Sequence, residues 1–392
     1  MTADNHERAA DSAETAIAHF DDPQKGLLGT FQHALHTTPA LVPLIVLIVG
    51  IALFGTLLGE RFFSPSTLTL ILQQVQVVGV LAAAQTLVIL TAGIDLSVGA
   101  IAVFCTVIMG QVTFRYFIPG IEGVLDCMVG GSDRALARAI EAGTVSGRCA
   151  AWLGSTAASA AIVIGLAAGT AMGAVSGWLV SRAKLPPFIV TLGMWQIVIA
   201  ANYLYSANET IRGRDIASAA PPLQFLGTTF KIGSANFTYG VLLMILIVLV
   251  LAYVLRATAW GRHVYAVGDD PEAAELAGVD VKRTLMSVYM LTGFICALAA
   301  WVMIGRYSSV SPSASTGVVG NIQAITAVVI GGISLFGGRG SIVGAFFGAL
   351  IVGTFELGLR MAGADPQWTF MLIGMLIIGA VMVDQWIRKV SA

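Results

Sequence analysis

Two acidic residues lie within otherwise apolar stretches and are the first candidates for chemistry. Asp95 and Glu356 are flanked mainly by uncharged residues. Ionisable groups at membrane depth are costly and are typical of proton relays and ion sites. Each also has a structural interpretation, which we favour. Asp95 can cap the free N–H groups where a helix begins near Ser97, and Glu356 precedes Arg360 by four residues, the favourable order for a helical ion pair.

Amide side chains form a second group of candidates. Gln74 and Gln85 are eleven residues apart, or about three helical turns, and therefore share one helix face. They can line a hydrated path for a polar solute, or they can form hydrogen bonds between helices, which contribute about 0.6 kcal/mol each. The spacing does not favour either alternative.

Motifs for enzyme chemistry are missing from the sequence. There is no Gly-Lys pair, and therefore no G-x-x-x-x-G-K-[ST] phosphate-binding loop. The apolar stretches contain no G-x-S-x-G nucleophile motif and no metal-ligand spacing. Four of the five histidines are scattered over the polar N-terminal segment, a pattern typical of solvated residues. We expect no catalytic site, no cofactor, no metal and no ATP hydrolysis by this chain.

The elements that must position these residues are membrane-spanning helices. Of 392 residues, 57% are hydrophobic and 11% are charged, which is too apolar for a soluble domain. A spanning helix needs about 20 apolar residues. Uncharged runs cover 40–59, 62–94, 96–114, 150–181, 185–208, 232–255, 284–305, 307–338, 340–355 and 366–383. We predict an all-α, polytopic transmembrane bundle of about ten spanning helices.

Two of these runs are longer than one helix requires. The runs 62–94 and 307–338 leave room for a re-entrant or loop portion, which is tolerated only where protein shields the backbone from lipid. Nine or eleven spans therefore remain as alternatives to ten.

Basic residues indicate the orientation of the chain. Arg182 and Lys184, the charged segment 258–284 and the tail 388–392 fall on one side if ten helices are present, and the positive-inside rule favours the cytoplasm for that side. Residues 1–39 are then a polar cytoplasmic tail without a cleavable signal peptide, and 40–387 form the membrane domain. The net charge of −1 argues against nucleic acid as a partner.

The same orientation places an insertion, 116–150, outside the cell. It contains Cys127 and Cys149, two of the four cysteines. A disulfide between them is consistent with an oxidising compartment and would contribute about 3 kcal/mol, and two free thiols are the alternative. Between the cysteines, Ser132 and Gly143 bracket residues that favour a short external helix.

Glycines recur at helical spacing in both halves of the chain. Small residues four apart lie on one helix face and let another helix approach closely. The first row is Gly165, Gly169, Gly173 and Gly177, and the second, which we place in the ninth helix, is Gly340, Gly344 and Gly348. We expect both rows to serve helix packing.

The polar connector between two strongly apolar helices has the features of a short helix. Asp269 or Asp270 provides the N-cap, Pro271 the first residue and Gly278 the stop. Such a helix beside the membrane suits a permease that receives motion from a separate motor protein, and an ordinary loop is the alternative. The residues in question are Gly268, Asp270, Pro271, Glu272, Ala273, Ala274 and Gly278.

Two further segments resemble each other at equal spacing. Residues 91–99 read T-A-G-I-D-L-S-V-G and residues 330–338 read I-G-G-I-S-L-F-G-G, with Gly, Ile, Leu and Gly in register. In a ten-helix topology they face the same side of the membrane, whereas a simple inverted repeat of five helices would place them on opposite sides. The candidate residues here are Gly93, Asp95, Ser97, Gly99, Gly331, Gly332, Ser334 and Gly338.

Together these segments resemble one family. The connector G-D-D-P-E-A-A with Gly278, the segment G-I-D-L-S-V-G at 93–99 and the glycine-rich segment 327–341 are similar to motifs of monosaccharide ABC-importer permeases of the ribose, xylose and fructose group. The resemblance covers roughly residues 45–387. The 116–150 insertion and the acidic tail depart from the family pattern, which leaves the docking surface for a binding protein open.

The resemblance implies a multi-pass protein of the bacterial inner membrane that forms the path for a monosaccharide. It also implies a second permease chain, two cytoplasmic ATPase domains docked on the connector and a periplasmic sugar-binding protein. Residues 384–389, D-Q-W-I-R-K, resemble fructose-type permeases most. The alternatives are an ABC permease for another polar solute, such as a branched-chain amino acid or nucleoside, and an ion-coupled transporter that uses Asp95 or Glu356.

Overall fold

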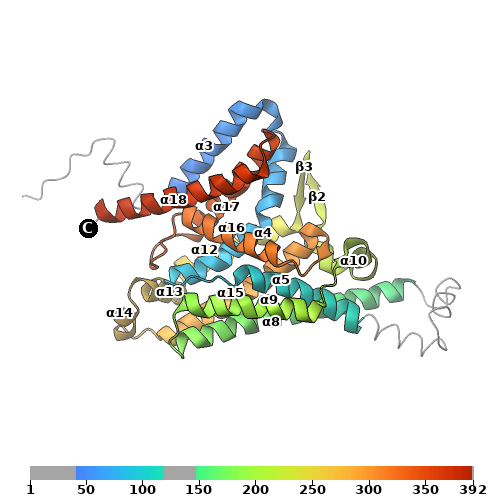
Figure 1. The fold of residues 1–392 in the computed structure, drawn as a ribbon, viewed down its shortest axis with the longest axis horizontal. Helices are drawn as coiled ribbons and strands as arrows, with labels where there is room; N and C mark the ends of the chain where they lie inside the picture. The colour runs from blue at the N-terminus through green and yellow to red at the C-terminus, as the bar shows by residue number, and fades with distance from the viewer. Residues whose placement is uncertain (1–40, 118–146, 391–392) are drawn as a thin grey trace, which may run out of the picture. The chain divides into compact units, whose positions relative to one another are not determined.

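Helices make up nearly all of the computed structural model, which describes residues 41–117 and 147–390. The predicted tail 1–39, the short external helix and Cys127 lie outside the described residues, and the side chain of Cys149 is not described either. Figure 1 follows the chain in order. The elements are α3 (Leu41–Leu58), η1 (Gly59–Arg61), α4 (Pro65–Leu90), α5 (Val98–Gln111), η2 (Val112–Phe117), α8 (Gly147–Ser181), α9 (Pro187–Ser206), β1 (Ile211–Arg212), α10 (Gly213–Ala219), α11 (Pro221–Gln224), η3 (Phe225–Gly227), β2 (Thr229–Ile232), β3 (Ala235–Thr238), α12 (Tyr239–Ala257), α13 (Ala259–Asp269), α14 (Pro271–Leu276), α15 (Val281–Tyr307), β4 (Ser309–Val310), α16 (Ala314–Ile330), α17 (Ile342–Met361) and α18 (Pro366–Val390).

Ten of these helices correspond to the ten uncharged runs of the sequence. Eight helices in the described part of the chain are long and apolar enough to cross a membrane, and α16 and the Gln367–Leu376 part of α18 are shorter apolar helices. The predicted fold class, an all-α polytopic bundle, is confirmed. The helices begin where the sequence supplies caps and prolines: Ser64 accepts a hydrogen bond from the N–H of Thr67 at the start of α4, and Pro187 starts α9.

The centre of the bundle is formed by α4, α5 and α15, the most buried of the long helices. Leu81, Leu87, Ile101, Met109 and Ile304 are fully shielded and belong to one apolar cluster. Lipid is as apolar as these side chains, so close packing rather than exclusion from water holds such helices together. This requirement explains why glycine and alanine are frequent at the contacts.

The first glycine row packs α8 against its neighbours. Gly169 and Gly173 lie against the backbone of α15: a Cβ on Gly169 would lie 2.6 Å from the carbonyl oxygen of Gly293, and a Cβ on Gly173 would overlap that of Tyr289. Gly165 faces Met109 of α5, and Gly177 faces the side chain of Tyr289. Backbone atoms cannot move aside as a flexible side chain can, so α8 and α15 tolerate only glycine at the middle of this contact.

The second glycine row differs from the prediction at Gly340. This residue precedes α17, whose N-cap is Ser341, and its φ of +135° is a conformation that side-chain-bearing residues rarely adopt. Gly340 therefore serves a turn rather than a helix contact. Gly344 and Gly348 do lie in α17 and face α16, where Gly331 approaches the Gly344 backbone and Gly348 lies against the carbonyl oxygen of Ala327.

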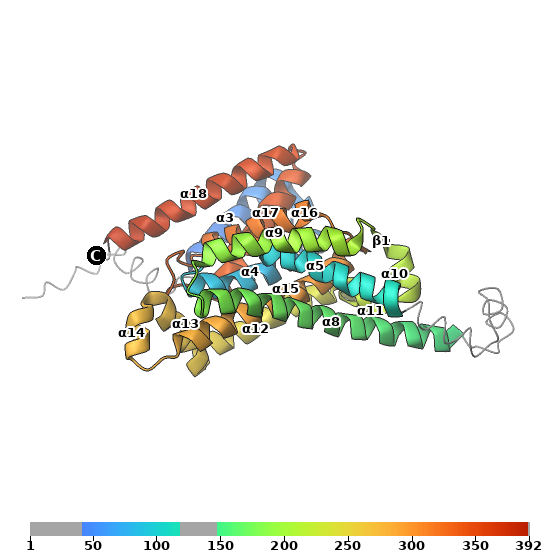
Figure 2. The same ribbon diagram turned by 60° about the horizontal axis from the view of Figure 1, so that its bottom comes forward.

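In the described part of the chain, four short strands lie at one end of the bundle. Strand β1 pairs with β4, and β2 pairs with β3 in an antiparallel hairpin. Two hydrogen bonds join the hairpin to α4. Gln73 donates to the Asn236 carbonyl (2.8 Å), and Thr238 donates to Gln76 Oε1 (2.8 Å). Figure 2 shows α13 and α14 at the opposite end of the long helices from α10 and α11.

The chain between α4 and α5 is non-helical and largely buried, as expected for part of the run 62–94. Asn321 of α16 donates to the Leu96 carbonyl (2.9 Å). The irregular backbone between these two helices is therefore shielded by protein, as irregular backbone within a membrane must be.

Candidate functional site

The three sequence motifs meet at one end of the bundle. The N–H of Gly338 donates to the carbonyl oxygen of Leu90 at the end of α4 (3.0 Å). Gly268, near the end of α13, touches both partners, since a Cβ there would overlap the Leu90 oxygen and lie 2.7 Å from the Gly338 nitrogen. Gly337 packs on Ala92. We call these contacts, which involve residues 90–92, 268–269 and 337–338, the motif junction.

The connector forms the short helix that its sequence predicts. Asp270 is the N-cap of α14 and accepts hydrogen bonds from the N–H groups of Glu272 and Ala273 (2.9 and 3.0 Å), and Pro271 is the first helical residue. Gly278 follows the helix with a φ of +87°. Ala274 is buried, whereas Leu276 is 91% exposed, which leaves an apolar side chain in a segment outside the spanning helices.

The loop before α17 is bound to the same connector. The hydroxyl of Tyr265 in α13 donates to the Gly340 carbonyl (2.9 Å). Burial raises the pKa of Tyr265 above its ordinary value and Arg256 opposes that rise, so the hydroxyl stays protonated as a donor near neutral pH. The connector thus contacts α4 through Leu90 and the loop before α17 through Gly338 and Gly340.

The segment 91–97 is held by side chains from three helices. Gln85 of α4 pairs its amide with the backbone of Asp95, donating to the carbonyl (3.0 Å) and accepting from the N–H (3.2 Å). Thr191 of α9 donates to the Ile94 carbonyl (3.0 Å), and Asn321 binds Leu96 as described. Gln85 is fully buried, so of its two alternatives the structure favours a packing role over a hydrated path.

Asp95 stabilises the start of α5, because its carboxylate contacts the N–H groups of Ser97 and of Val98, the first helical residue. Its carboxylate accepts from the N–H (2.7 Å) and the hydroxyl (2.6 Å) of Ser97, and Ser97 itself is the N-cap of α5. The carboxylate therefore contacts free N–H groups as predicted, although Asp95 lies two residues before the N-cap residue Ser97.

The other motif residues lie at close backbone contacts and turns. Gly93 lies beside Val88 and the Tyr289 hydroxyl, and Gly99 faces the backbone of Gly317 in α16. Ser334 accepts from the N–H of Phe336 (3.2 Å), and Gly332 adopts a positive φ (+76°) at the end of α16.

A cavity lies beside the start of α5. It is bounded by α4, α15 and α16 and has a volume of about 290 Å³. Its lining residues are Val77, Val78, Leu81, Gly99, Met303, Tyr307, Ser315, Thr316, Gly317, Val319, Gly320 and Gln323. The lining contains both aliphatic side chains and hydroxyl and amide groups, so the cavity combines an apolar wall with hydrogen-bonding groups. None of the lining residues that the structure describes carries a formal charge at neutral pH.

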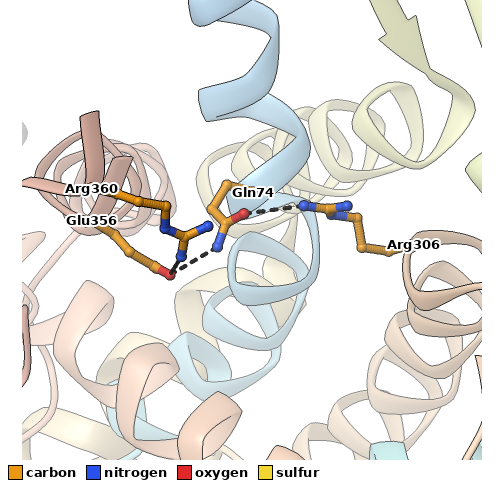
Figure 3. Close-up of polar contacts among 4 residues, drawn as sticks. All are labelled: Gln74, Arg306, Glu356 and Arg360. Atoms are coloured by element: carbon orange, nitrogen blue, oxygen red, sulfur yellow. Dashed lines mark hydrogen bonds and ion pairs between the residues drawn. The ribbon is translucent and has the colours of Figure 1, made fainter. Parts of the chain in front are cut away.

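A polar network lies next to this cavity and joins α4, α15 and α17 (Figure 3). Arg306 donates to Gln74 Oε1 (3.1 Å) and to the Gln73 carbonyl (3.1 Å), and Gln74 Nε2 donates to Glu356 Oε1 (2.9 Å). Glu356 also pairs with Arg360 (2.9 Å), the predicted helical ion pair. Arg306 precedes the cavity residue Tyr307 in sequence, so the network borders the site without lining it.

Two arginines of the network, Arg306 and Arg360, should differ in how much they stabilise the folded protein. Arg306→Met would leave two acceptors on α4 without their donor, and hydrogen bonds to charged groups contribute about 1.5–3 kcal/mol. Arg360→Met would remove a cation whose side chain is 63% exposed, and such pairs are worth about 1 kcal/mol or less. We expect the thermal unfolding midpoint in detergent to fall clearly for the first variant and little for the second. Equal midpoints would show that the network does not hold α4 to α15.

Sequence reasoning identifies some of these residues and misses others. Gln74, Gln85, Asp95 and Glu356 stand out because polar groups are rare in apolar runs. Arg306 does not, because it directly follows the run 284–305, where a flanking charge is ordinary. Tyr307, Thr316 and Gln323 carry no signal, since nothing in their spacing shows that α4, α15 and α16 share a cavity.

Comparison with known proteins shows that this chain is similar to permease components of import systems. A family model described as the branched-chain amino acid transport system permease component matches residues 67–381. The chain is 57% identical over 386 residues to a fructose import permease of Rhizobium meliloti, covering 98% of this chain and 96% of that protein. It is 32% identical over 356 residues to a ribose import permease of Bacillus subtilis, with 89% and 91% covered, and 29% identical over 345 residues to a D-allose transport system permease of Escherichia coli, with 88% and 91% covered. No solved structure matches.

Proposed function

Because this chain belongs to the family of permease components described for branched-chain amino acid transport systems, we propose that it forms the membrane path of an ABC importer for fructose. One observation carries the choice of solute: identity to the fructose import permease is 57%, against 32% and 29% for the ribose and D-allose proteins, each over most of the chain. The chain is a multi-pass protein of the inner membrane and a transport component.

The connector supports the proposal that a separate ATPase drives transport. The helix α14 lies outside the spanning segments, and Leu276, Glu272 and Ala273 are exposed on it. These side chains are accessible to a protein partner in a short helix that no spanning segment covers. We place the ATPase here, on the cytoplasmic side, with a periplasmic binding protein on the opposite side and a second copy of this chain completing the path.

The motif junction provides a route for motion to reach the membrane. A shift of α14 moves α13, and Gly268 transmits that shift to Leu90 of α4 and to Gly338 before α17. Both helices contact the polar network, and α4 lines the cavity. Alternating access through rigid-body movement of these helices is the mechanism that this connectivity supports. The solute itself undergoes no chemical change.

A second candidate solute has a specific observation in its favour. The family description names branched-chain amino acids, and the coupling parts would be alike for either cargo. Uptake of labelled fructose, ribose, D-allose and leucine separates the candidates. Matched cells would carry the cognate ATPase and binding protein, with and without this chain. We expect ATP-dependent fructose uptake to be lost without the chain, and a selective loss of leucine uptake would instead support the amino acid cargo.

A further inference from the structure

We propose that the cavity between α4, α15 and α16 is the site that a neutral monosaccharide occupies during passage, with Tyr307 as a stacking surface and Thr316 and Gln323 as hydrogen-bonding groups. This inference rests on the proposed transport function and names its solute site. The position of the cavity beside the start of α5, its size, its lining and its lack of charge each support it.

The cavity lies beside a break between two spanning helices. Gly99 lines it at the first turn of α5, directly after the irregular segment 91–97. Gly317, which also lines it, lies in the first turn of α16. Solute sites of transporters are commonly formed where helices are interrupted.

Size and lining fit one sugar molecule. A volume of about 290 Å³ equals that of about ten water molecules, close to the number of non-hydrogen atoms in a hexose. A sugar presents hydroxyl groups at its edge and C–H groups on its faces. Val77, Leu81 and Met303 offer the cavity's apolar wall, and Tyr307, which is 53% exposed, offers an aromatic ring. Thr316 and Gln323 supply hydrogen-bond donors and acceptors.

The absence of charge in the described lining favours a neutral solute over an amino acid. An amino acid carries an ammonium and a carboxylate group, and a charge that enters a low-dielectric site without a partner is strongly penalised. Arg306, the charged residue next to Tyr307 in sequence, is already engaged by Gln73 and Gln74. A few neutral hydrogen bonds also suit a path that must release its cargo.

Thiol labelling tests the site directly. In a background with Cys127→Ala and Cys149→Ala, the two remaining cysteines, Cys105 and Cys296, are buried. Gln323→Cys would then place a thiol in the cavity, and Leu249→Cys would place one on the exposed face of the spanning helix α12. A charged, membrane-impermeant methanethiosulfonate reagent is applied to cells that contain the assembled importer. We expect Gln323→Cys to react about tenfold faster, because a thiol in lipid stays protonated.

Protection by solute distinguishes a sugar site from a merely hydrated gap. Saturating fructose should slow labelling of Gln323→Cys several-fold, and leucine should not. Equal labelling of the two cysteines, or labelling that no transported solute slows, overturns the site while leaving the permease assignment intact. If ribose but not fructose is taken up and also slows labelling, the proposed substrate is wrong and the site holds. If leucine is taken up and slows labelling, the neutral-sugar inference is wrong.

Transport selectivity gives an independent measure. Thr316→Val and Gln323→Leu each remove hydrogen-bonding groups from the lining and keep a similar volume. A neutral hydrogen bond contributes about 1 kcal/mol, so fructose uptake should fall about fivefold in each variant. Uptake of a deoxyfructose that lacks the contacted hydroxyl should fall less. A uniform loss for all sugars would indicate a structural role and contradict the assignment of these residues.

Discussion

Gly173→Leu is expected to prevent α8 from packing on α15 and to abolish both folded protein and uptake. A side chain at this position would overlap the carbonyl oxygen of Tyr289, and a Cβ would lie 3.1 Å from the Gly293 Cα. Because both obstacles are backbone atoms of a long helix, relief requires the two helices to separate. Overpacking typically costs about 1–3 kcal/mol and occasionally more, which is a large part of the total stability of a typical domain. Size-exclusion chromatography of detergent-solubilised protein, together with uptake, measures the outcome.

Gly193 provides the matched control. It also lies inside a spanning helix, α9, but it is exposed, and a Cβ at this position would have no neighbouring atom within 4 Å. Gly193→Leu should leave the chromatographic profile and uptake unchanged, since leucine is the better helix former by about 0.8 kcal/mol. A monodisperse, active Gly173→Leu protein would show that the α8–α15 contact is not needed, and equal damage in both variants would point to a general intolerance of glycine replacement.

The sequence predicts most of the fold because membrane helices obey a simple rule. Charge is expensive in the bilayer core, so each of the ten helices coincides with an uncharged run, and Pro187 and Pro271 mark helix starts. The same rule does not give the conformation of the chain between helices. Asp95 and Arg339 interrupt the uncharged runs, but no residue type predicts how 91–97 or the turn at Gly340 folds. Their shape depends on partners such as Asn321 and Tyr265, which lie far away in sequence.

The candidate site is predictable only in part, for a related reason. The motif residues can be named from their resemblance to a family, but their mutual contact cannot, because Leu90, Gly268 and Gly338 come from three distant segments. The equal spacing of 91–99 and 330–338 hints at a relation, and the ten-helix topology places both on one side. The structure shows them in contact at the motif junction, which fits that topology and not a simple inverted repeat of five helices.

Gly268 occupies the point in this junction where space is most restricted. Its neighbours are a carbonyl oxygen of α4 and an amide nitrogen of the loop before α17, which are also bound to each other. Any side chain at Gly268 must therefore break the Gly338–Leu90 hydrogen bond or push α13 away from both segments. In either case α13, which leads into α14, loses its contact with Leu90 of α4, a helix that lines the cavity. The exposed surface of α14 itself is unchanged.

We therefore expect Gly268→Val to uncouple ATP hydrolysis from uptake. Loss of a buried backbone hydrogen bond and overpacking each cost about 1–3 kcal/mol, so uptake should fall on the order of a hundredfold. Membrane insertion and ATPase activity in assembled complexes should persist, because the spanning helices and α14 are not altered. His263→Val, on an exposed position of the same helix, should keep uptake near the wild-type rate. Normal uptake with Gly268→Val would show that motion reaches the path elsewhere. Loss of ATPase activity together with uptake would mean that the junction positions the docking surface rather than transmitting its movement.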